Sequence, residues 1–239
     1  MKKYVIIVAG GSGRRMGATI PKQFLLLAGK PVLMHTIEAF HRYDAAINII
    51  LVLPESQQDY WRELCTEHNF RLKVTTVAGG ASRFMSVKNG LANVQRANDA
   101  LVAIQDGVRP LVTTKLIRDV FEAAEKHQAA YAAVQVVDTL RKIELDGHAK
   151  EVDRSQFKLV QTPQAFLAPV ILDAYDSASE SPSYTDDISV VVDILRPFIV
   201  EGSKENIKIT TPEDLELAEA ILLVRNLRLK TAITTACRK

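Results

Sequence analysis

The stretch that decides the fold is Val5-Ile-Ile-Val-Ala-Gly-Gly-Ser-Gly-Arg-Arg-Met-Gly17, closely followed by Pro21-Lys22-Gln23-Phe24. It opens with a short, fully apolar run, which predicts a strand buried on both faces, as in a parallel sheet. The glycines that follow allow a tight bend whose backbone N–H groups can converge on an anion. Arg14, Arg15 and Lys22 add positive charge beside that bend. The stretch therefore favours a binding site for a polyphosphate, such as that of a nucleotide.

The spacing of the glycines separates this loop from two common nucleotide-binding motifs. Gly11, Gly13 and Gly17 give G-x-G-x-x-x-G, not the G-x-G-x-x-G of dinucleotide-binding folds. A P-loop needs Lys directly after its last glycine, whereas Ala18 follows Gly17. The pattern A-G-G-x-G-x-R-M-G, with P-K-Q after it, instead resembles the signature loop of sugar-type nucleotidyltransferases, which bind a nucleoside triphosphate. A plain strand-to-helix turn is the alternative, but such a turn needs no basic residues.

Composition limits the classes of protein that fit. The chain has 239 residues, of which 47% are hydrophobic, enough for one large α/β domain with an excursion. Its net charge of +2 indicates no nucleic-acid or membrane partner. Cys65 and Cys237 are too few for a disulfide framework or a zinc site, so a reduced, cytoplasmic setting is expected. The first apolar run stops at Ala9, too early for a signal peptide or a membrane span.

Apolar runs alternate with amphipathic stretches along most of the chain. This alternation predicts an α/β fold, a Rossmann-like, mostly parallel sheet with helices on both faces. Ligands in such sheets bind at the carboxyl ends of the strands. The expected strands are 4–9, 47–53, 72–77, 100–105, 130–137 and 198–200, and the expected helices are 32–42, 56–68, 83–94, 115–127 and 169–177.

Residues 138–162 interrupt the alternation. Thr139 to Leu145 alternate with a period of two, and Asp146-Gly147 is a strong hairpin signal. We expect a β-hairpin arm here, inserted into a single domain made of residues 1–137 and 163–225, with 226–239 as a C-terminal tail. Because a lone hairpin is marginal in water, the arm is expected to pack on a second copy of the chain, giving a homodimer. A flap folded onto its own domain is the alternative.

A second group of candidate residues follows the run 101–104. Asp106 and Arg109 lie in Gln105-Asp-Gly-Val-Arg-Pro110, at the predicted end of a strand. A carboxylate there is well placed to hold Mg²⁺ or another divalent cation, which binds oxygen ligands and orients a leaving pyrophosphate. Arg109 can bind a second phosphate through its planar fork. An ordinary strand-terminating turn is the alternative reading.

Three sites carry helix-start signals. Ser82 is an N-cap candidate for the helix that follows Gly79-Gly80. Asp186 and Asp187 follow Thr185 in a pattern that favours helix capping over a metal site. Thr211-Pro212-Glu213-Asp214 predicts a further helix, with an apolar stripe at Leu215, Ala218, Ile221 and Leu222. From about Arg225 onward the residues are basic and polar, and we expect this segment to fray.

The order of motifs carries a closer resemblance. A-G-G-x-G-x-R-M-G, P-K-Q, D-G-V-R-P, D-T, V-D-R, Q-T-P-Q-x-F, T-D-D and N-I-K-I-T-x-P-E-D-L follow one another between residues 9 and 215. The set resembles the 2-C-methyl-D-erythritol 4-phosphate cytidylyltransferases of non-mevalonate isoprenoid biosynthesis. The resemblance implies the nucleotide-diphospho-sugar transferase type of fold, a swapped hairpin arm in a homodimer, and CTP and a polyol phosphate as substrates.

The resemblance also implies site residues. Arg15 and Lys22 would contact the triphosphate and stabilise the transition state, Asp106 would position Mg²⁺ and substrate, and Lys208 would complete the catalytic set. The loops at Ala9, Gly10, Gly11 and Gly13, and at Gly80, Ala81 and Ser86, would hold CTP. Gly10 and Ala81 differ from the residues of some family members, which bears on base selectivity. The acceptor would be surrounded by Arg109, Thr139, Arg154, Thr162, Thr185 and Lys208, some of them from the partner's arm.

The implied reaction is an in-line displacement at the α-phosphorus of CTP. The attacking phosphate is already an anion, so the enzyme must supply alignment and positive charge instead of a general base. Ribitol 5-phosphate is the rival acceptor, because such cytidylyltransferases share the first loop and the Q-T-P-Q motif. A nucleotide-binding module without turnover is disfavoured, because the charged set is complete.

Overall fold

A computed structural model of the protein describes residues 1–11, 20–181 and 184–236, with side chains to residue 228. Within this part, a seven-stranded sheet has the order β11-β7-β10-β6-β1-β4-β5. Every pair is parallel except the two made by β10, which runs antiparallel to β6 and β7. The strands are β1 (Lys2–Val8), β4 (Asn48–Leu53), β5 (Thr75–Ala78), β6 (Ala100–Asp106), β7 (Ala129–Gln135), β10 (Lys158–Leu167) and β11 (Phe198–Glu201).

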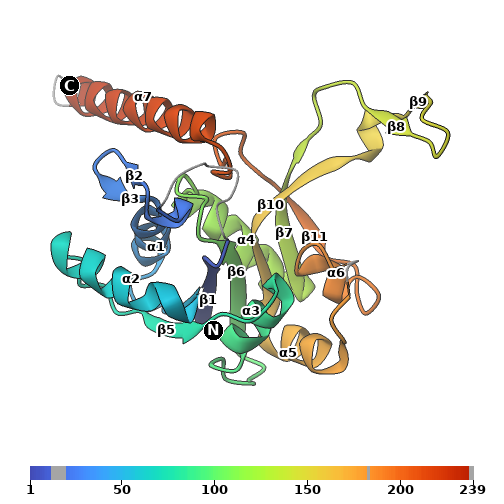
Figure 1. Ribbon diagram of the computed structural model, residues 1–239, viewed down its shortest axis with the longest axis horizontal. Helices are drawn as coiled ribbons and strands as arrows, with labels where there is room; N and C mark the ends of the chain where they lie inside the picture. The colour runs from blue at the N-terminus through green and yellow to red at the C-terminus, as the bar shows by residue number, and fades with distance from the viewer. Residues whose placement is uncertain (12–19, 182–183, 237–239) are drawn as a thin grey trace.

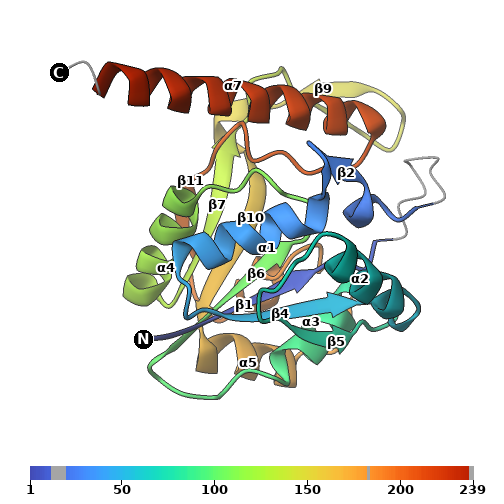
Figure 2. The ribbon, with the colours of Figure 1, turned by 90° about the vertical axis from the view of Figure 1, so that its left-hand side faces the viewer.

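Helices cover both faces of this sheet, as Figures 1 and 2 show. Side chains of β1 alternate between two cores: Val5 and Ile7 face α1, α2 and α4, whereas Tyr4 and Ile6 face α3, α5 and α6. The expected doubly covered, mostly parallel sheet is thereby confirmed. The helices are α1 (Val32–Tyr43), α2 (Glu55–Glu67), α3 (Arg83–Leu91), α4 (Thr114–His127), α5 (Ala168–Ser177), α6 (Ile188–Val191) and α7 (Pro212–Ala236).

Strand β10 corrects the expected extent of the arm. The sequence assigned residues up to 162 to the arm, but Lys158–Leu167 enters the main sheet between β7 and β6. A central strand with Pro163 in it is unusual, because proline cannot donate a ladder hydrogen bond. The register shifts between Val160 and Gln164, and this irregularity accommodates the proline. Strand β5 also begins later than expected, at Thr75.

The predicted hairpin is present as β8 (Arg141–Ile143) paired with β9 (Ala149–Glu151). Gly147 has φ +82°, which suits glycine at the turn, and Glu144 N–H donates to the His148 carbonyl across it. The hairpin projects from the sheet in Figure 1. Ile143, with 66% of its surface exposed, Leu145 and Phe157 present apolar side chains to solvent there.

Helix α7 begins at Pro212, as expected, and the Asp214 carboxylate accepts hydrogen bonds from the backbone N–H groups of Thr210 and Thr211. The predicted stripe packs against Leu27 and Val108. The expected fraying from Arg225 is wrong, because the helix continues to Ala236. Arg225 holds this part of the helix by donating to the Leu111 carbonyl and pairing with Glu205. In the described chain, no helix combines the length and apolar character needed to cross a membrane.

Candidate functional site

A cavity of about 450 Å³ opens at the carboxyl ends of the central strands. The loops that leave three of these strands are tied to a neighbouring strand at their first residues. Ala9 N–H donates to the Val52 carbonyl, Gly79 N–H to Leu53, and Gly107 N–H to Val8. The loops therefore start together, as the sequence predicted for a parallel sheet. The lining includes Ala9, Gly10, Gly11, Lys22, Gly80, Ala81, Ser82, Arg83, Ser86, Asp106 and Lys208.

Small residues shape one wall of this cavity. A Cβ on Gly80 would overlap the Cβ of Met85, so a side chain there would move the first turn of α3. The Ser86 hydroxyl accepts from Gly80 N–H at 3.0 Å and donates to the Ser82 carbonyl at 2.8 Å. Ser82 caps α3 by accepting from Met85 N–H, as expected. The loop before α3, whose Gly79, Gly80 and Ala81 line the cavity, is thus held in place by Ser82 and Ser86.

Lys22 reaches the cavity from a short 3₁₀ turn, Lys22–Phe24. The turn is held by Gln23, whose buried side chain donates to the Ala9 carbonyl at 2.8 Å and to Gln57 at 2.6 Å. The sequence identified Lys22, but the role of Gln23 in placing it was missed, although Gln23 belongs to the P-K-Q motif. Gly13 and Arg15, both predicted in the first loop, lie outside the described residues.

Two basic side chains converge on Asp106, which lines the cavity. Its Oδ2 lies 3.0 Å from Lys208 Nζ and 3.3 Å from Arg109 Nε. Burial by itself raises the pKa of the Asp106 carboxyl, but the positive charges of Lys208 and Arg109 outweigh burial, so the pKa is lowered overall. The carboxylate is therefore ionised at neutral pH. Lys208, far along the chain, is brought here by the segment before α7.

The backbone around Asp106 connects it to β10. Asp106 N–H donates to the Thr162 hydroxyl at 3.0 Å, and Arg109 donates to the Asn206 carbonyl at 2.8 Å. Thr162, which the resemblance implied for the acceptor, therefore lies beside Asp106. In the part of the chain that the structure describes, no group of three or more His, Cys, Asp or Glu side chains could hold a metal by itself.

Of the six predicted acceptor residues, Lys208 lines the cavity, and Arg109 and Thr162 are buried beside Asp106 without lining it. The other three lie elsewhere in this chain. Thr139 and Arg154 are exposed on the arm, and Arg154 donates to the Val137 carbonyl. Thr185 is exposed in the loop before α6. Asp186 accepts from Ser189 N–H, as expected of a capping residue, whereas the Asp187 side chain makes no capping hydrogen bond. Within one copy of the chain, the structure thus assembles Lys22, Asp106, Arg109, Thr162 and Lys208 but leaves the arm residues apart.

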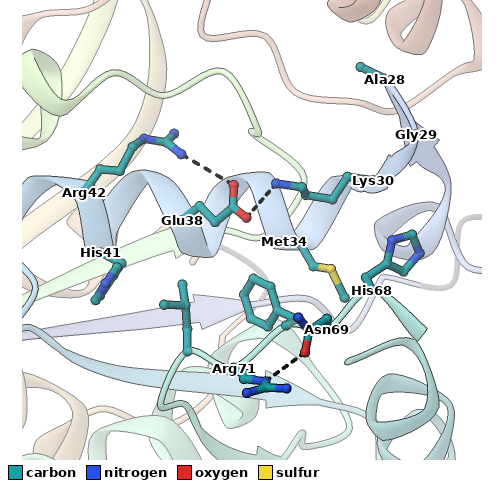
Figure 3. A pocket seen from close by; sticks show the side chains of 12 residues that line it. Ala28, Gly29, Lys30, Met34, Glu38, His41, Arg42, His68, Asn69 and Arg71 are labelled. Atoms are coloured by element: carbon teal, nitrogen blue, oxygen red, sulfur yellow. Dashed lines mark hydrogen bonds and ion pairs between the residues drawn. The ribbon is translucent and has the colours of Figure 1, made fainter. Parts of the chain in front are cut away.

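Figure 3 shows a second cavity, which lies against α1 and the segment after α2. Its basic residues Lys30 and Arg42 both pair with Glu38, and Arg71 donates to Asn69. Glu38 therefore offsets one of the three formal positive charges of Lys30, Arg42 and Arg71, and all three side chains already have partners. The cavity is also remote from the strand ends, where an α/β sheet binds its ligand, so the first cavity is the candidate site.

Glycine-rich loops, a buried carboxylate and converging basic side chains at one edge of a mostly parallel sheet define a nucleotidyltransferase. Comparison with known proteins specifies the kind. The chain belongs to the 2-C-methyl-D-erythritol 4-phosphate cytidylyltransferase family, whose model matches residues 3–224. It is therefore a cytidylyltransferase and an enzyme of the isoprenoid pathway.

Relatives support this assignment over nearly the whole chain. The cytidylyltransferase of this name from Azobacteroides pseudotrichonymphae is 56% identical over 223 residues, covering 92% of this chain and 99% of that protein. The one from Bacteroides thetaiotaomicron is 52% identical, covering 93% and 100%. The crystal structure of the enzyme from Thermus thermophilus is 32% identical, with a TM-score of 0.74 and coverage of 92% and 98%.

Proposed function

We propose that this chain transfers CMP from CTP to 2-C-methyl-D-erythritol 4-phosphate and releases pyrophosphate. The observation that carries the proposal is the meeting of Lys22, Asp106 and Lys208 in one cavity whose walls are glycine-rich backbone. Cytosine would lie against the Gly80–Ala81 backbone, and the triphosphate would lie along Ala9, Gly10 and Gly11, near Lys22. The acceptor would enter on the side of Arg109, Thr162 and Lys208.

The chemistry is one displacement at phosphorus. A phosphate oxygen of the acceptor forms a bond to the α-phosphorus of CTP, the bond from that phosphorus to the bridging oxygen breaks, and pyrophosphate leaves with the electron pair. The attacking oxygen is already anionic, so no proton has to be removed. Lys22, together with Arg15 from the first loop, would stabilise the negative charge that grows on the α-phosphate. Lys208 and Arg109 would hold the acceptor phosphate in line.

A divalent cation such as Mg²⁺ fits this donor set only with help from the substrate. Asp106 supplies one ionised carboxylate that would hold the cation, and its ion pairs with Lys208 and Arg109 are made at Oδ2. Mg²⁺ commonly binds through one or two carboxylates plus substrate phosphates. When bound, it would neutralise phosphate charge and favour departure of pyrophosphate. Asp106 would thus hold the cation while Lys208 and Arg109 keep the carboxylate in place.

We also propose a homodimer formed through the arm. Ile143, Leu145 and Phe157 expose apolar surface that a second copy would bury. The same contact would carry Thr139 and Arg154 toward the acceptor side of the neighbouring copy. The alternative arrangement of the arm is a flap that closes on its own domain. A cytoplasmic setting is a separate prediction, made from the low cysteine content.

Pyrophosphate release tests the proposed reaction. Purified protein is given CTP and Mg²⁺ with either 2-C-methyl-D-erythritol 4-phosphate or ribitol 5-phosphate, and turnover with the first acceptor is expected. Turnover with ribitol 5-phosphate alone would contradict the acceptor assignment while leaving the roles of Lys22 and Asp106 intact. CTP binding without turnover on either acceptor would contradict the proposed reaction.

A further inference from the structure

A buried ion pair that the proposed chemistry does not use joins the cavity to the loop that carries Thr185. Arg83, on the first turn of α3, lines the cavity, and Asp187 is the last residue before α6. Arg83 Nη1 donates to Asp187 Oδ1 at 2.9 Å, and Nη2 donates to Oδ2 at 2.5 Å. The guanidinium thus gives one edge to a bidentate pair, the geometry that only arginine provides.

The pair is unevenly buried. The Asp187 side chain has 0% of its surface exposed, whereas the Arg83 side chain keeps 32%, on the side of the cavity. Tyr175 of α5 donates a further hydrogen bond to Asp187 Oδ1 at 2.7 Å. Burial and the nearby carboxylate raise the pKa of Tyr175, so its hydroxyl stays a donor. Replacing a buried ion pair with apolar residues is often neutral or stabilising. Stability alone therefore does not explain why Arg83 and Asp187 form an ion pair here.

The loop before α6 is anchored on both sides of Thr185. Asp187 is held by Arg83, and Tyr184 stacks on Phe84, the neighbour of Arg83 in α3, with ring centroids 5.8 Å apart. Two consecutive residues of α3 therefore hold Tyr184, directly before Thr185, and Asp187, two residues after it. The side chain of Thr185 itself is exposed.

The same loop is also attached to β10. The Gln164 side-chain carbonyl accepts from the N–H groups of Asp187 and Ile188 at 3.0 and 3.1 Å, and its amide donates to Asp186. Gln164 lies two positions after Thr162, which accepts from Asp106 N–H. The loop is consequently connected to the start of α3, beside the cavity wall at Gly80 and Ala81. Through β10 it is also connected to Asp106.

We propose that the Arg83–Asp187 ion pair positions Thr185 for the acceptor phosphate and links its placement to the cavity wall at Gly80 and Ala81. Arg83 and Asp187 are then positioning residues, and the ligand whose binding depends on them is a polyol phosphate. The inference rests on the proposed function and on the acceptor role that the family resemblance implies for Thr185.

The test measures the two substrates separately. Arg83→Lys keeps the charge but loses the fork, and Asp187→Asn keeps the shape but loses the charge. Each is expected to raise the KM for the acceptor about tenfold, while the Kd for CTP, measured by calorimetry without acceptor, stays within about twofold. The double variant is expected to cost no more than the worse single variant, because both remove one interaction.

Two controls separate positioning from stability. Arg96→Lys alters an exposed ion pair with Asp173 and Asp176 on α5 and is expected to leave both constants unchanged. Tyr175→Phe removes a hydrogen bond from Asp187 without touching Arg83, so it should lower Tm by about 2 °C or more with little change in KM. If Asp187→Asn does not fold, Tyr184→Leu, which removes the other anchor beside Thr185, must raise the acceptor KM instead.

The proposal is overturned if Arg83→Lys weakens CTP binding as much as acceptor binding, or if it lowers Tm and leaves all kinetic constants at wild-type values. Turnover of the wild-type protein in the same assay separates this outcome from a failure of the proposed function. A wild-type protein that is inactive with every acceptor would overturn the reaction, whereas an active wild type with an unaffected Arg83→Lys would overturn only the positioning role.

Discussion

The cavity and the arm differ in how their residues are held. In the cavity, Lys22 is placed by Gln23, Asp106 by Thr162, and the strand ends are tied to one another by backbone hydrogen bonds. The arm has one two-stranded ladder and exposed ion pairs such as Arg141–Glu151, at 3.9 Å. Exposed pairs of this kind contribute little stability. One copy of the chain therefore fixes the cavity residues by itself, whereas the arm is expected to need a partner.

The largest effect expected on the cavity side is that of Lys22→Ala. Removing a charged donor from the transition state is expected to lower kcat about a hundredfold or more. The fold should be unchanged, because Gln23 still ties the turn to Ala9. Steady-state kinetics and thermal unfolding check this prediction. An unchanged kcat with a raised KM would make Lys22 a ground-state binding residue.

The arm can be tested by mixing two inactive variants. Arg154→Ala lacks the arm residue and Lys22→Ala lacks the cavity residue, so each is expected to be nearly inactive alone. If the arm completes the site of the other subunit, a mixed dimer contains one intact site, and an equal mixture should regain about a quarter of wild-type activity. Subunits are mixed, exchanged and assayed. No recovery despite demonstrated subunit exchange would favour a flap that serves its own domain.

A smaller and more local effect is expected at the cavity wall formed around Gly80. Gly80→Ala would place a Cβ against Met85 and displace the start of α3. CTP affinity should therefore fall about tenfold, and the free energy of unfolding should fall by about 1–3 kcal/mol. Gly10→Ala is the matched control, since its Cβ would meet Pro54 at an ordinary 3.8 Å. Calorimetric titration with CTP compares them. Equal losses for both variants would show that steric closeness does not shape this wall.

The smallest effect concerns pH. The pKa of Asp106 is lowered in the folded state, so its stabilising contribution is present above the unfolded value of 3.8 and is lost as pH falls through the lower folded value. The difference in unfolding free energy between wild type and Asp106→Asn should therefore shrink below about pH 4. Urea unfolding at several pH values measures it. A difference that stays constant down to about pH 2 would contradict the ionised assignment.

The sequence predicted the features that line the cavity better than the elements packed around them, β10 and the end of α7. The strand before Ala9, the turn at Asp106 and the helix cap at Ser82 follow from local patterns, and the structure confirms them. The first residues of β10 were misread as part of the arm, because their pairing with β7 joins positions that are remote in sequence. The end of α7 was misread because the contacts of Arg225 with Leu111 and Glu205 are remote in sequence.

By itself, then, the sequence determined the alternating strands and helices, the glycine-rich loops and the hairpin, because hydrophobic period and turn chemistry act over a few residues. Only the tertiary structure decided that Lys208 meets Asp106, that Thr162 supports it, and that Arg83 is paired with Asp187. These contacts join positions far apart in the chain. They form only when the sheet order brings the strands together, and no local pattern encodes that order.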